Sequence, residues 1–120
     1  MKKLILIVAL LFSLAISAQK EQIVKDYNYA YSQGEYKEVK TRFFFNYGGD
    51  NTKVRIYIGD KVFNLTQIGA TKEGETESKI RYQLLTLLDD ETLEKLYLQY
   101  FEIDSVRLLF NDGVTIEFMN

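Results

Sequence analysis

The stretch 106–118 reads VRLLFNDGVTIEF, with two alternating apolar runs on either side of the loop 111–113. Alternation with a period of two is typical of strands that bury one face. A two-residue turn at Asp112-Gly113 would set apolar residues opposite polar ones, whereas a three-residue loop aligns them. Gly113 supplies the left-handed residue that such a loop needs. The stretch therefore predicts a β-hairpin that pairs Phe110 with Val114, Leu108 with Ile116, Val106 with Phe118 and, on the outer face, Arg107 with Glu117.

A second hairpin is predicted at Gly59-Asp60, because glycine suits the first position of a type II′ turn. This turn pairs Ile56 with Phe63 and Val54 with Leu65, so that apolar side chains face one another. Along the rest of the chain the period of two continues, and turn residues recur about every 8–12 residues. We predict strands at Ile23–Ser32, Tyr36–Tyr47, Lys53–Ile58, Lys61–Ile68, Lys79–Leu88, Lys95–Glu102, Val106–Phe110 and Val114–Met119.

This pattern predicts a single all-β domain over residues 19–120. It would be one antiparallel meander of about 7–8 strands that forms a sandwich or a partly open barrel. The segment 90–101 fits helical spacing as well as strand spacing, and we favour a strand from Lys95 after a single helical turn near Asp90–Glu94. The Gly- and Glu-rich segment Gly69–Ser78 is predicted to be an exposed, mobile loop.

The N-terminus predicts a secretory signal peptide over residues 1–18. Lys2-Lys3 precede the 13-residue apolar run Leu4–Ile16, and the small residue Ala18 precedes Gln19. This order is typical of export signals. The alternative is an uncleaved anchor, but a spanning helix needs about 20 apolar residues. We therefore expect cleavage before Gln19, a mature protein in the periplasm or outside the cell, and no stable membrane insertion.

The composition narrows the chemistry that this chain can perform. It contains no His, Cys or Trp, which argues against imidazole or thiolate metal sites and against His-activated nucleophiles. Once Lys2 and Lys3 leave with the signal peptide, 13 basic residues face 17 acidic ones, a net charge of −4. The basic residues are scattered, which argues against nucleic acid as a partner. We expect a protein that is not an enzyme and has no metal or other cofactor.

The candidate binding residues are Tyr27, Tyr29, Tyr31 and Phe44. The three tyrosines alternate, so a regular strand would place them on one face, where they could bind a protein or glycan partner. The alternative is that this row packs into the core. Phe44 would point outward if Phe43 and Phe45 point inward, and an outward Phe among charged residues could anchor an interface.

Two loops that contain carboxylates are candidates for a metal site. The segment Asn46–Asn51 offers oxygen ligands and glycines but lacks the spacing of a dedicated calcium loop. Asp89-Asp90-Glu91 lies at a turn, where solvated carboxylates are common. Turn chemistry explains both loops, and no metal site is predicted.

Two segments carry a resemblance to known proteins. The leader that ends Ser17-Ala18-Gln19 resembles export signals of Bacteroidetes-type bacteria, and the stretch 106–118 resembles small secreted β-rich proteins of that group, which have no assigned function. Asp104-Ser105-Val106 resembles the short O-glycosylation acceptor of such bacteria, which implies a glycan on Ser105. The resemblance implies no other site residue.

Three functions remain open from the sequence. The leading hypothesis is a non-catalytic secreted or periplasmic binding domain, which predicts a filled core and an exposed Tyr/Phe patch. The alternative is a small-ligand carrier with a lipocalin-like barrel, which predicts an internal void. The least favoured is a hydrolase that uses carboxylates alone, which predicts two acids facing each other in a cleft.

Overall fold

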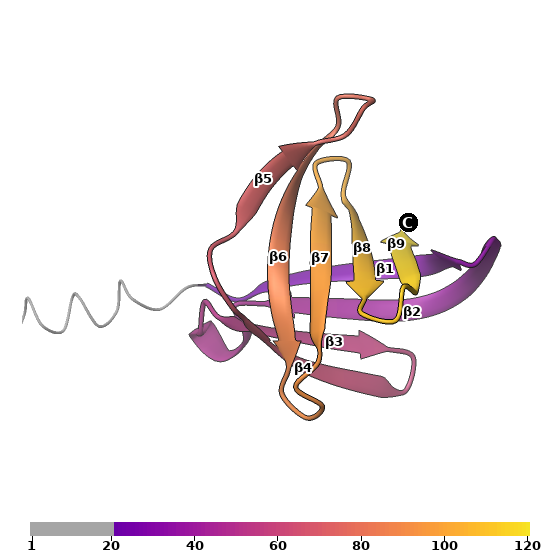
Figure 1. Cartoon of the computed structure of the whole chain (residues 1–120). Coiled ribbons are helices and arrows are strands. Elements are labelled where there is room, and N and C mark those ends of the chain that lie inside the picture. Colours follow the sequence, from indigo (N-terminus) through magenta and orange to yellow (C-terminus); the bar gives the residue numbers. More distant parts are fainter. Residues whose placement is uncertain (1–20) are drawn as a thin grey trace, which may run out of the picture.

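The computed structural model describes residues 21–120, so the predicted signal peptide lies outside the described residues. These residues form one nine-stranded antiparallel sheet (Figure 1). Its strands are β1 (Ile23–Ser32), β2 (Glu35–Phe45), β3 (Lys53–Ile58), β4 (Lys61–Gln67), β5 (Lys72–Glu75), β6 (Arg81–Asp89), β7 (Lys95–Phe101), β8 (Ser105–Phe110) and β9 (Thr115–Met119). In this same part of the chain, no helix is long and apolar enough to cross a membrane.

The sheet closes on itself as a barrel, which confirms the predicted all-β meander and decides between sandwich and barrel. Except for β4 and β5, which both pair with β6, strands that follow one another in the chain pair with one another, and β9 pairs back onto β1. The last gap is closed by β4 and β6, through only three residue pairs, Leu65–Asp89, Thr66–Leu88 and Gln67–Leu87. In Figure 1, β6 and β7 run nearly perpendicular to β1 and β2, as expected for a strongly coiled sheet.

The segment predicted to be a mobile loop, Gly69–Ser78, instead contains β5. Gln67 pairs with Leu87 and Lys72 with Leu84, so β4 and β5 run along β6 as one strand interrupted by a bulge at 68–71. Gly74 lies opposite Tyr82, whose ring occupies the space that a Cβ on Gly74 would take. The prediction of a loop was wrong because pairing with β6, rather than apolar side chains, makes this segment a strand.

Both predicted hairpins are confirmed in register. In the C-terminal hairpin the Phe110 N–H donates to the Val114 carbonyl at 2.9 Å, and Gly113 has φ of 90°. The Arg107 guanidinium lies 3.4 Å from the Glu117 carboxylate on the outer face. In the other hairpin Ile56 pairs with Phe63 and Val54 with Leu65, with Gly59 at φ 60°.

The segment 90–94 is a turn, and β7 begins at Lys95 as predicted. The Leu93 N–H donates to the Asp89 carbonyl at 2.8 Å, which is one helix-like hydrogen bond without a helix. The short 3₁₀ turn Tyr47–Gly49 lies elsewhere, between β2 and β3.

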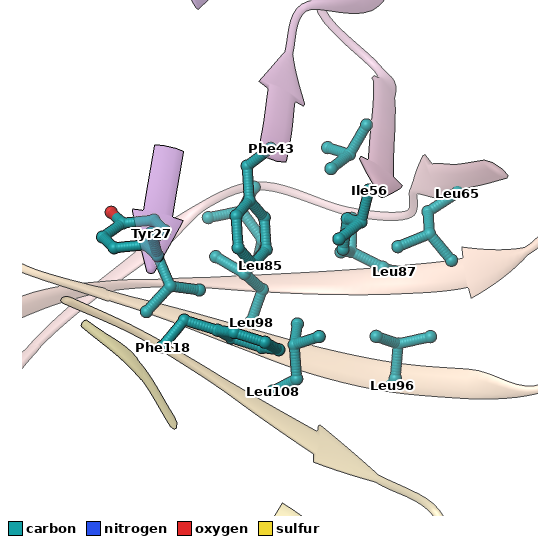
Figure 2. Close-up of a cluster of buried hydrophobic side chains, with 12 residues drawn as sticks. Tyr27, Phe43, Ile56, Leu65, Leu85, Leu87, Leu96, Leu98, Leu108 and Phe118 are labelled. Atoms are coloured by element: carbon teal, nitrogen blue, oxygen red, sulfur yellow. The ribbon is translucent and has the colours of Figure 1, made fainter. Parts of the chain in front are cut away.

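The interior of the barrel is filled by side chains (Figure 2). Phe43 is fully buried in this interior, and its ring centroid lies 5.6 Å from that of Tyr27 and 5.3 Å from that of Phe118. The other members of the cluster are Val54, Ile56, Leu65, Leu85, Leu87, Leu96, Leu98, Val106 and Leu108. Because these residues come from all eight strands of the barrel wall, the core holds the wall together from inside.

Candidate binding site at the barrel mouth

The predicted tyrosine row is divided by a bulge. Tyr27 pairs with Thr41 but Tyr29 pairs with Glu38, so the register shifts between the two tyrosines. Tyr27 is only 1% exposed and belongs to the core, whereas Tyr29 is 45% exposed. Beyond the shift it is Ala30 that lies opposite the buried Phe118, which leaves Tyr29 and Tyr31 on the outer face. The expectation that all three share one face was therefore wrong.

Phe44 points outward, as predicted, but it lies at the other end of β1 from the exposed tyrosines. It pairs with Val24, and its ring packs edge-on against Tyr47 and Tyr57, each 5.7 Å away. The Arg55 guanidinium lies 4.1 Å above the Tyr47 ring and donates to its hydroxyl at 2.6 Å. The four predicted residues therefore do not form one surface, and Phe44 instead belongs to a cluster that holds the β2–β3 loop.

A hollow of about 790 Å³ opens at the end of the barrel where β1 begins and β2 ends. Its floor is apolar and its rim carries amides and hydroxyls. It is lined by Ile23, Lys25, Phe45, Asn46, Asn51, Thr52, Gln67, Gly69, Ala70, Thr71, Gln83, Leu85 and Tyr100. The bulge at 68–71, which interrupts the strand along β6, forms one side of this barrel mouth.

Sequence reasoning did not find the barrel mouth, because its residues come from distant parts of the chain. One signal was present in the strand pattern. Lys25 lies two positions before the inward-facing Tyr27, and Gln83 lies two positions before the inward-facing Leu85. Residues two positions apart on a strand share a face, so an apolar residue is expected at both places. Polar residues at inward positions near a strand end indicate the place where a barrel opens to solvent.

Lys25 borders a polar network at the seam between β1 and the β7–β8 turn. The hydroxyls of Tyr27 and Tyr100 both donate to Oδ1 of Asp104, each at 3.0 Å, and Nζ of Lys25 lies 4.0 Å from the same oxygen. Hydrogen bonding to Tyr100 and the charge of Asp104 raise the pKa of Lys25. Burial and the Asp104 carboxylate raise the pKa of Tyr27. At neutral pH Lys25 is therefore an ammonium and Tyr27 a neutral phenol.

A second hollow, of about 640 Å³, adjoins the barrel mouth and shares Gln83 and Tyr100 with it. It lies along the β5–β6 hairpin and is mainly acidic. The residues that line it are Glu73, Gly74, Glu75, Arg81, Tyr82, Gln83, Tyr100 and Glu102. The two hollows are therefore neighbours, and their linings differ in charge.

The Asn46–Asn51 segment has ordinary turn chemistry. The Asp50 carboxylate accepts the Thr52 N–H at 2.9 Å and the Thr52 hydroxyl at 2.7 Å, and these bonds lower the pKa of Asp50. In residues 21–120 no group of three or more acidic side chains is arranged to hold a metal ion.

Ser105, the residue implied as a glycan acceptor, is only 5% exposed. Among the described residues its hydroxyl has no hydrogen-bond partner. The folded barrel therefore buries the oxygen to which a glycan would be attached.

Comparison with known proteins adds no family assignment: no protein-family model, curated protein or solved structure matches this chain.

Proposed function

We propose that this chain is a non-catalytic binding protein of the periplasm or cell exterior, and that it takes a small ligand in the barrel mouth. The observation that carries the proposal is the hollow of about 790 Å³ at one end of a barrel whose interior is otherwise packed. Ligand pockets commonly measure about 300–1,000 Å³ and often lie in the mouths of β-barrels.

The lining supports binding rather than catalysis. Phe45 and Leu85 offer an apolar floor, while amides such as Gln83 and Asn51 can donate and accept hydrogen bonds at the rim. Nucleophilic catalysis needs a nucleophile beside a general base, and Lys25 with Tyr100 does not supply that pair while the ammonium stays protonated. The proposal therefore needs only shape, apolar area and a few polar contacts.

The test is binding of N-phenyl-1-naphthylamine, a neutral apolar dye whose fluorescence rises when it leaves water. Ala70 is exposed at the rim of the barrel mouth, so Ala70→Trp should fill the opening without entering the core. Val62 is also exposed but lies next to the Gly59-Asp60 turn at the opposite end, so Val62→Trp is the matched control. We expect the dye to bind the unmodified protein and Val62→Trp, and to lose binding in Ala70→Trp. Equal binding by both variants, or no binding by the unmodified protein, would contradict the proposal.

A second candidate function is docking of a protein or glycan partner on the outer face of the β1–β2 hairpin. Tyr29, Tyr31 and Tyr36 are exposed there, and the last two rings lie 4.5 Å apart. Tyrosines supply large contact area at low entropic cost. Loss of a partner in Tyr36→Ser with unchanged binding of the dye would favour this surface.

A further inference from the structure

We infer that the ligand of the barrel mouth carries a single anionic head on an apolar body, and that the Lys25 ammonium binds the head. This inference rests on the proposed function, since it assigns a ligand class to the same site.

The charge of the barrel mouth comes from Lys25. Among the described residues that line it, Lys25 alone is charged, and its side chain is 38% exposed. It sits on the inward side of β1, between Ile23 at the rim and Tyr27 in the core. The ammonium is open to solvent on the side of the hollow, so an anion that enters the barrel mouth can reach it and be attracted by its charge.

Asp104 does not use up the donors of this ammonium. The distance of 4.0 Å from Nζ to Oδ1 is too long for a hydrogen bond. The same Oδ1 already accepts the hydroxyls of Tyr27 and Tyr100, and Asp104 lies outside the lining of the barrel mouth. Asp104 therefore holds the neighbouring phenols in place. Apart from the hydrogen bonding to Tyr100, the N–H donors of Lys25 remain available for a ligand in the opening.

The apolar part of the ligand has a matching surface next to Lys25. Phe45 and Tyr100 pack against each other with ring centroids 5.7 Å apart, and both line the barrel mouth together with Leu85. Removing apolar surface from water favours binding, so an apolar body that covers this floor would be stabilised there. A ligand that was charged throughout would leave this floor uncovered.

The acidic hollow along the β5–β6 hairpin limits the ligand to one negative charge and determines how the ligand is oriented in the barrel mouth. Glu73, Glu75 and Glu102 outnumber Arg81 there, so a second anionic group would meet repulsion on crossing Gln83 and Tyr100. The head must consequently lie on the β1 side, against Lys25, and the body must extend over the apolar floor.

Two dyes with the same aromatic skeleton provide the test: 8-anilino-1-naphthalenesulfonate carries a sulfonate, and N-phenyl-1-naphthylamine is uncharged. We expect the anionic dye to bind about tenfold more tightly or better, because its sulfonate can accept a charge-assisted hydrogen bond from the Lys25 ammonium. Lys25→Met, which keeps about the same length of side chain, should remove that preference. It should weaken binding of the anionic dye and leave binding of the neutral dye unchanged. Lys25→Arg should retain the preference.

Lys37→Met is the charge-matched control, because Lys37 is exposed on the β1–β2 hairpin and its removal changes net charge equally. It should bind both dyes like the unmodified protein. If the unmodified protein binds both dyes equally, or Lys25→Met keeps the preference, the ligand class is wrong but the proposed site stands. If neither dye binds the unmodified protein, or if Ala70→Trp still binds both dyes, the proposed function fails as well. Thermal melts of each variant exclude dye binding to unfolded protein as the cause.

Discussion

At the residue scale, Tyr27 and Tyr29 lie two positions apart on one strand and have opposite surroundings. The register shift between them turns Tyr27 into the core and leaves Tyr29 exposed. Tyr27→Ser should therefore cost about 3–5 kcal/mol of unfolding free energy, as expected for the loss of a buried aromatic ring. Tyr29→Ser should cost less than about 1 kcal/mol. Urea denaturation of both variants measures the difference, and equal losses would show that the shift is misplaced.

The Tyr27 hydroxyl gives the protein a pH dependence at alkaline pH. Burial and the hydrogen bond to Asp104 raise the pKa of Tyr27 above its unfolded value of about 10. A raised folded-state pKa means that this group's stabilisation is complete below about pH 10 and is lost as the pH rises further.

Tyr27→Phe removes that group and tests the direction of the effect. It should cost about 1 kcal/mol at neutral pH, from the lost hydrogen bond to Asp104. The cost should shrink as the pH rises from about 9 to 11, because only the unmodified protein loses stability through this group. Denaturation curves at each pH measure it, and a cost that stays constant would refute the role of Tyr27.

At the element scale, the C-terminal hairpin separates packing from charge. Phe110 packs against the core from a half-buried position, so Phe110→Ala should cost about 2–3 kcal/mol, below the value for a fully buried ring. Arg107 pairs with Glu117 on the partly solvated outer face, so Arg107→Ala should cost less than about 1 kcal/mol. Chemical denaturation compares the two, and a larger effect at Arg107 would reverse the assignment of faces.

The same scale explains which elements the sequence could predict. The hairpins at Gly59 and Gly113 combine a glycine at positive φ with matched alternation on both sides, and both signals are local. β5 reads Lys-Glu-Gly-Glu and has no apolar face, so its strand character comes only from pairing with the distant β6. No glycine marks the bulge beside Tyr27 in the sequence. The sequence therefore predicts that Tyr27, Tyr29 and Tyr31 alternate regularly along the strand, and this prediction is wrong.

At the scale of the whole molecule, the barrel mouth could not be predicted because closure of the barrel creates it. Lys25 and Gln83 are far apart in the chain and come to line one opening only after β4 pairs with β6. The alternation along each strand identifies Lys25 and Gln83 separately as polar residues at inward-facing positions. Their proximity depends on the order of strands around the barrel, which alternation does not encode.

The seam between β4 and β6 should open more easily than the pairing between β7 and β8. It holds three residue pairs, whereas β7 and β8 share six. Local opening is easiest where few interactions must break. The Ile68 N–H, which donates to the Thr86 carbonyl at 2.9 Å beside this seam, should therefore exchange with deuterium faster than the amides of β7 and β8.

A ligand in the barrel mouth should change that exchange in a specific way. Gln67 and Gly69, on either side of Ile68, both line the opening. Bound 8-anilino-1-naphthalenesulfonate should stabilise the closed seam, so saturation with this dye should slow exchange at the Ile68 amide. Exchange in the turn at 111–113 should stay unchanged. Hydrogen-exchange mass spectrometry or NMR resolves the two regions. Protection spread evenly over the barrel would indicate general stabilisation, and protection confined to 111–113 would place the dye at the wrong end.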